Sequence, residues 1–266
     1  MIKRPAIFLF CFLGITPLLG AEEATLPFDH SAWDQFVKKV VDEKGEVDYV
    51  RAKEEVSLLD RYLEKLKTIP NFPTWDWPRE ERLAVLINAY NASLIKKVVD
   101  RYPVKTVNRI SGVWELPIVT MGVHSFSLNS VQKSLINGFR DEKIIFALCS
   151  GAQGSPPLRR EAYVASKIDG QLYEAARDFV NDAERNQIVP GEKKVVLSRL
   201  FKWNASSFLL NWGDYPEEAK WNPAEIAVLS FVAHYLQDPA RLEFLKEGEY
   251  KVKYADFDWG LNQTGR

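Results

Sequence analysis

The sequence LAVLINAYN, residues 83–91, decides the fold of this chain. Asn88 and Asn91 are its only polar residues, so apolar side chains cover most of the circumference of a helix formed here. The surrounding pattern predicts one helix from about Arg79 to Arg101. Such a helix must be surrounded by protein. Its two asparagines then either line a site or satisfy the carbonyl groups of a neighbouring loop.

Helical spacing of apolar residues recurs on both sides of this central segment. It predicts helices from Ser31 to Lys44-Gly45, over 51–68, from Ser127 or Asn129 to Gly138, over 167–181 and over 223–236. Strand patterns are fewer and comprise a hairpin over 118–126, a buried strand over 143–148, and strands near Val195 and over 250–254. We therefore expect an α+β fold, a helix-rich single domain with a small, mainly antiparallel β-sheet.

The N-terminus has the layout of a cleavable signal peptide. Lys3 and Arg4 precede an apolar run of about 14 residues, which ends in Gly20 and Ala21. A membrane-spanning helix needs roughly 20 such residues, and no later run is long enough. We therefore predict a signal peptide over 1–21, one globular domain over 22–266, and export to the periplasm or the medium without a membrane span.

Composition excludes several classes of partner and site. The 35 basic and 36 acidic residues leave no positive excess that would favour nucleic acid, so no nucleic-acid partner is expected. Once the signal peptide is removed, Cys149 is the single cysteine, which excludes an intramolecular disulfide. The three histidines, His30, His124 and His234, show no metal-ligand spacing, and we expect neither a metal nor another cofactor.

A loop rich in glycine and proline, residues 150–157, follows the predicted strand over 143–148. Gly151 and Gly154 would allow backbone amides to converge in a nest that binds a carboxylate or phosphate, with Arg159 and Arg160 nearby. A tight turn followed by arginines at a solvated helix start is the alternative.

Five blocks of sequence occur in order along the chain: LINAYNA at 86–92, RYPV at 101–104, SLN at 127–129, IFAL at 145–148 and PPLRREAY at 156–163. With HSAW at 30–33 and the closing DW and LN at 258–262, they resemble the domain of unknown function 547 (DUF547) family over about residues 28–262. The resemblance implies a fold distantly like that of papain or transglutaminase, and thiol hydrolysis as the suspected chemistry.

The residues that this resemblance would make catalytic are replaced here. Typical members of the family carry cysteines at the positions of Ser150 and Ser155, and a histidine in the helix after the SLN block, where this chain reads Ser130-Val131-Gln132-Lys133. Cys149 lies one residue before the first of those positions. On a strand, that step would reverse the face to which the sulfur points.

Two functions remain open. In the first, the protein is a non-catalytic binding module for a peptide or a small acidic ligand. Its candidate binding residues are Ser150, Gly151, Gly154, Ser155, Arg159, Asn88 and Asn91. In the second, it is a cysteine hydrolase or acyl-transferase that uses Cys149 with His124. Free cysteines are commonly buried as small hydrophobic residues, so the surroundings of the Cys149 sulfur decide between the two.

Overall fold

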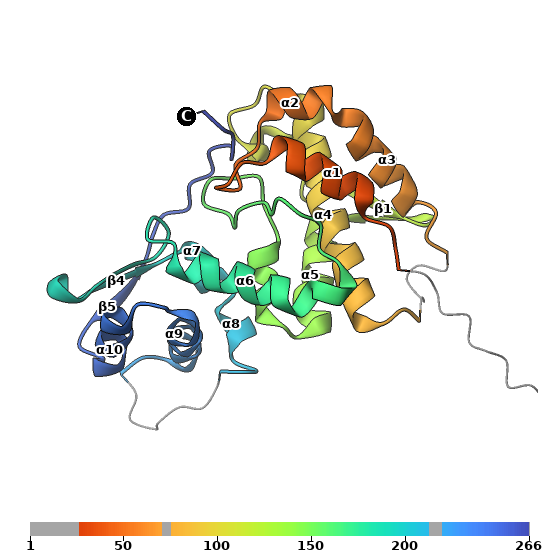
Figure 1. The fold of residues 1–266 in the computed structure, drawn as a ribbon. Coiled ribbons are helices and arrows are strands. Elements are labelled where there is room, and N and C mark those ends of the chain that lie inside the picture. The colour runs from red at the N-terminus through yellow and green to blue at the C-terminus, as the bar shows by residue number, and fades with distance from the viewer. Residues whose placement is uncertain (1–26, 71–75, 213–219, 266) are drawn as a thin grey trace, which may run out of the picture.

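A computed structural model describes residues 27–70, 76–212 and 220–265 (Figure 1). The predicted signal peptide lies outside these ranges. The α-helices are α1 Ser31–Val40, α2 Tyr49–Glu54, α3 Val56–Leu66, α4 Arg79–Arg101, α5 Leu128–Phe139, α6 Ile168–Asn181, α7 Arg199–Trp203, α8 Ala205–Phe208, α9 Pro223–Tyr235 and α10 Pro239–Glu247. Short 3-10 helices are η1 Val107–Arg109, η2 Glu142–Ala147, η3 Ala165–Lys167 and η4 Pro190–Glu192.

The strands form two small sheets. Strands β1 Pro117–Met121 and β2 His124–Ser127 make an antiparallel hairpin. In the second sheet, β3 Gln187–Val189 pairs antiparallel with β4 Lys194–Leu197, and β4 pairs parallel with β5 Lys251–Tyr254. The predicted helix-rich α+β class with mainly antiparallel pairing is confirmed, although the strands are divided between two sheets.

Helix α4 occupies the middle of the N-terminal part of the molecule, as its apolar sequence predicts. It packs against α2, α3, α5, α6 and the hairpin strand β1 (Figure 1). Leu83, Ile87 and Leu94 are fully buried, and so is Asn88. None of the helices in the described ranges is both long enough and apolar enough to cross a bilayer.

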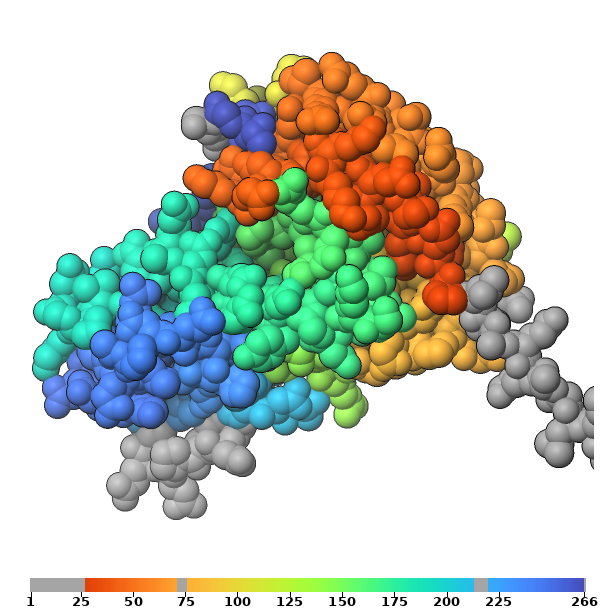
Figure 2. All heavy atoms as spheres, in the orientation of Figure 1, coloured from red at the N-terminus to blue at the C-terminus, as the bar shows by residue number. Residues whose placement is uncertain are grey.

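The buried side chains form two hydrophobic cores. The first core lies among α1–α5 and the hairpin, and the second lies among the C-terminal half of α6, the second sheet and α7–α10. Figure 2 shows the same division on the surface, with red to orange N-terminal helices on one side and teal to blue elements on the other. Helix η2 joins them, because Ile145 and Phe146 enter the second core while Ile144, Ala147 and Leu148 enter the first.

The predicted strand over 143–148 is wrong, because these residues form η2. Asp141 caps this helix by accepting a hydrogen bond from the backbone amide of Lys143. A short apolar run is compatible with a strand or a buried helical turn, and here side chains must point in several directions to reach both cores. The predicted helix over 51–68 is divided at Glu55 into α2 and α3. Helix α10 and strand β3 were not predicted.

The C-terminal tail, which we define as residues 255–264, leaves β5 and crosses the molecule to the start of α2 (Figure 1). Its backbone pairs with segments far away in sequence. Leu261 donates to the carbonyl of Lys105, Asn262 donates to that of Gly151, and Thr264 donates to that of Val47. The tail therefore fixes the loop after η2 against the N-terminal helices.

Candidate functional site

Asn88 and Asn91 hold the two ends of the segment that follows η2. Asn91 Nδ2 donates to the Ala147 carbonyl at 3.0 Å, while its Oδ1 accepts from the Cys149 amide at 3.0 Å. Asn88 makes the same pair of bonds to the carbonyl and amide of Tyr163, at 2.7 and 3.0 Å. Both asparagines are buried. They satisfy loop backbone groups, the second of the two predicted roles, and so they position the site.

The Cys149 side chain points into the first core and is 1% exposed. Its sulfur accepts from the Gly151 amide and from Asn262 Nδ2, each at 3.4 Å, and lies 3.7 Å from Ser155 Oγ. Burial raises the pKa of this thiol, and these hydrogen bonds only partly oppose that effect. Cys149 is therefore held as a neutral thiol at neutral pH.

The three histidines have their contacts elsewhere. His30 Nδ1 lies 2.9 Å from the Tyr62 hydroxyl, His234 packs against Trp212, and His124 lies exposed on β2 with its ring against Phe126. None of them is a hydrogen-bond partner of Cys149. The proposed pair of Cys149 and His124 does not form in this structure. Among the described residues, no group of three acidic, histidine or cysteine side chains could hold a metal ion.

Burial lowers the pKa of His30 from 6.5 to about 4. Nδ1 also lies 3.1 Å from the Asn88 amide nitrogen, which is a donor. A neutral ring can accept at this atom, whereas a protonated ring would place two donors against each other. The structure therefore favours neutral His30.

We expect His30 to make the free energy of unfolding fall by up to about 3 kcal/mol as the pH falls from 6.5 to 4. The unfolded chain takes up this proton near pH 6.5 and the folded chain only near pH 4, so the stabilisation is complete above that window and is lost as the pH falls. Urea unfolding of His30→Gln should show a flatter pH dependence. The exposed-site variant His124→Gln should keep the wild-type slope; parallel curves for His30→Gln and wild type would contradict the assignment.

Four amides of the glycine loop, residues 150–155, are paired within the chain. Gly151 donates to the Cys149 sulfur, Gln153 to the Gly260 carbonyl, Gly154 to the Asp258 carbonyl and Ser155 to the Ala152 carbonyl. A Cβ on Gly154 would lie 2.9 Å from the Asp258 amide nitrogen, so glycine here permits the close approach of the tail. The anion nest, one of the two arrangements that the sequence left open for this loop, has no free donors among these four amides.

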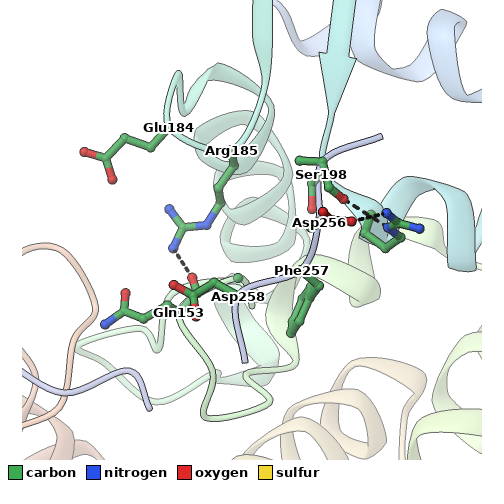
Figure 3. Close-up of a pocket in the computed structure, with 10 residues that line it drawn as sticks. Gln153, Glu184, Arg185, Ser198, Asp256, Phe257 and Asp258 are labelled. Carbon is green, nitrogen blue, oxygen red and sulfur yellow. Dashed lines mark hydrogen bonds and ion pairs between the residues drawn. The ribbon is translucent and has the colours of Figure 1, made fainter. Parts of the chain in front are cut away.

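The arginines near this loop are also paired with carboxylates. Arg159 contacts Glu161 and Glu174, and Arg160 contacts Glu43. A cavity of about 210 Å³ beside the loop contains Arg185, which donates to the Gln153 carbonyl at 3.1 Å (Figure 3). The carboxylates of Glu184, Asp256 and Asp258 line the same cavity, and Glu184 points away from Arg185 in Figure 3. A second arginine of the lining, Arg199, is paired with Asp256 at 2.7 Å. This balance of charge does not suit an anion.

A larger cavity, of about 430 Å³, lies where the two cores meet, and we call it the aromatic cavity. Within the described ranges, its lining consists of aromatic rings, aliphatic side chains, uncharged polar groups and a single carboxylate. The rings are Tyr90, Trp114, Trp203, Phe257 and Trp259, the aliphatic residues are Ile145, Leu148, Pro156 and Leu200, and the polar residues are Glu115, Asn129, Gln132, Ser150 and Asn204. Ser150 Oγ is buried and makes no hydrogen bond within the described chain. Ser150 thus lines this cavity, whereas Cys149 and Ser155 are buried in the protein beside it.

Residues 74–180 match the model of the family described as "Protein of unknown function, DUF547". The match confirms the predicted resemblance to DUF547 over these residues, within the wider range of about 28–262 that the sequence blocks cover. No curated protein and no solved structure matches the chain. The expected likeness to papain or transglutaminase is therefore not confirmed.

The aromatic cavity is shared between the DUF547 segment and the chain after it. The segment contributes Glu115, Asn129, Gln132 and Ser150, including one position at which the family resemblance expects cysteine. Trp203, Phe257 and Trp259 come from α7 and the tail, outside the matched residues. The sequence did not predict that these rings line a cavity. Trp259 belongs to the DW block at 258–259, but nothing in that block indicates a cavity.

Proposed function

We propose that this protein is an exported, non-catalytic binding module whose ligand occupies the aromatic cavity. One observation carries the proposal: the hydroxyl that lines the cavity, Ser150 Oγ, has no base in hydrogen-bond contact, while the nearby thiol faces the core. A serine hydroxyl is a weak nucleophile unless an adjacent base activates it. The cavity therefore has the features of a binding site without those of a nucleophilic centre.

The alternative, a cysteine hydrolase that uses Cys149, requires an accessible thiolate. Reactive cysteines have a lowered pKa beside a cation, an imidazolium or a helix N-terminus. Cys149 has a raised pKa and no contact with an imidazole, and its three hydrogen-bonding neighbours enclose the sulfur. These features support binding over catalysis.

Iodoacetamide should label Cys149 in the native protein no faster than the chain unfolds. The sulfur is enclosed and protonated, and only its thiolate reacts. Mass spectrometry of labelling time courses, with and without urea, measures the two rates. Rapid native labelling that follows a thiol pKa below 8.5, together with ester hydrolysis that Cys149→Ala abolishes, would overturn the proposed function.

The lining of the aromatic cavity also bears on the ligand. A peptide or a small acidic ligand was expected from the sequence, but the described residues that line the cavity include Glu115 and neither lysine nor arginine. Acidic groups are normally matched by such cations. We therefore propose a ligand without negative charge.

Export rests on the N-terminal pattern of Lys3, Arg4 and the apolar run that follows. N-terminal sequencing of the protein recovered from its native cells tests this part. A start at Glu22 supports export, and an intact Met1 in the cytoplasmic fraction contradicts it.

A further inference from the structure

We propose that the aromatic cavity binds a neutral carbohydrate, whose ring stacks on an exposed aromatic platform. The inference rests on the proposed binding function and names its ligand class. We define the platform as Trp203, Phe257 and Trp259. Their ring centroids lie 5.0 Å apart for Trp203 and Phe257, 4.5 Å for Phe257 and Trp259, and 6.0 Å for the two tryptophans.

The platform is unusually open to solvent. Trp203 is 52% exposed and Trp259 is 39% exposed, although both are large apolar side chains. Exposed apolar patches beside polar groups mark ligand-binding grooves, because water is released when a ligand covers them. A sugar ring presents a flat face of C–H groups that suits such a surface, and its hydroxyl groups lie around the edge of that face.

Polar side chains without hydrogen-bond partners among the described residues line the same cavity as the platform. The side chains of Glu115, Asn129 and Gln132 make no hydrogen bond or ion pair with other described residues, and Ser150 Oγ is buried without a partner. The cavity therefore offers donors and acceptors that a ligand could satisfy. At about 430 Å³ it falls within the range of small-molecule sites, roughly 300–1,000 Å³.

The combination of aromatic rings with carboxylate, amide and hydroxyl groups favours one class of ligand over others. Nucleic acid also stacks on aromatic rings, but it needs cations for its phosphates, and no lysine or arginine of the described part of the chain lines this cavity. A cation over the rings would leave the amide donors of Asn129 and Gln132 unused. A proline-rich peptide has few N–H donors for the Glu115 carboxylate. Sugar hydroxyls both donate and accept, so they fit carboxylate, amide and hydroxyl groups together.

The test is a titration of the full mature chain with neutral oligosaccharides, chosen from a glycan array and followed by tryptophan fluorescence and calorimetry. We expect saturable binding that Trp203→Ala weakens at least about tenfold, because stacking would be lost. Gln132→Ala should weaken binding several-fold and leave the stability of the fold unchanged, because the Gln132 side chain makes no hydrogen bond within the described chain. The matched control is Tyr173→Ala, an aromatic side chain that is 45% exposed outside the cavity, and it should bind like wild type.

The possible results test the carbohydrate assignment separately from the proposed binding function. If no neutral glycan binds, or if Trp203→Ala and Gln132→Ala both bind as wild type does, the carbohydrate assignment is overturned. If instead a peptide library yields a ligand that Trp203→Ala abolishes, the binding module stands and only its ligand class is wrong. Turnover of an ester or amide that Ser150→Ala abolishes would overturn the binding module itself.

Discussion

Replacing Gly45 by alanine should destabilise the protein by about 4 kcal/mol. Gly45 has a positive φ of 78°, a conformation that costs a residue with a Cβ roughly 1–2 kcal/mol. The added Cβ would also lie 2.4 Å from Pro157 Cβ and 3.0 Å from the backbone of Leu158. Overpacking of this kind typically costs about 1–3 kcal/mol more, because backbone atoms cannot rotate away. Urea unfolding of Gly45→Ala measures the sum.

Gly170→Ala is the matched control, because it adds the same methyl group in a different setting. Gly170 lies within α6, and nothing surrounds the position of its Cβ within 4 Å. Alanine there should stabilise the protein by roughly 0.5–1 kcal/mol, through helix propensity. If Gly45→Ala were as stable as wild type, the turn at 42–46 would not pack against Pro157 and Leu158 as described.

Asn91→Leu should cost about 3–5 kcal/mol of unfolding free energy. Leucine has a similar size, but it can neither donate to the Ala147 carbonyl nor accept from the Cys149 amide. Both backbone groups would then be buried without partners, at roughly 1–3 kcal/mol each, with the remainder from strain as the loop moves. Because that loop carries Ser150, the variant should also lose ligand binding in the aromatic cavity.

The control for this variant is Asn137→Leu on α5. Asn137 is exposed and has no side-chain hydrogen bond within the described chain, so the change should alter stability by no more than about 0.5 kcal/mol. Comparable melting of Asn91→Leu and Asn137→Leu in calorimetry would show that Asn91 does not hold the loop.

Local pattern was sufficient for much of the fold. The central helix was predictable because the run at its centre leaves just two polar positions. Of the two residues predicted to cap α5, Ser127 and Asn129, Ser127 is the cap and accepts from the amide of Ser130. Helix η2 could not be predicted in this way. Its side chains enter two different cores, and one of those cores is formed by elements that follow η2 by many residues. A strand and a 3-10 turn of this length share the same composition.

The site was less accessible to sequence reasoning than the fold. Ser150 was singled out through the family resemblance, and it does line the larger cavity. The sequence left both a nest and a tight turn open for the glycine loop, because the partners of its amides, Asp258 and Gly260, lie in the distant tail. Trp203 and Trp259 line the same cavity as Ser150 through tertiary packing alone, and no spacing in the sequence indicates this arrangement.

The hydrogen bond between Tyr49 and Asn262 predicts an order of events during refolding. The Tyr49 hydroxyl donates to Asn262 Oδ1 at 2.7 Å across a separation of 213 residues. Contacts between such distant positions form late, because the entropy of closing a long chain must be overcome before they contribute. Asn262 also shields the Cys149 sulfur, to which its Nδ2 donates a hydrogen bond. The thiol should therefore stay reactive through early refolding and become shielded only at the last kinetic step, when the tail docks.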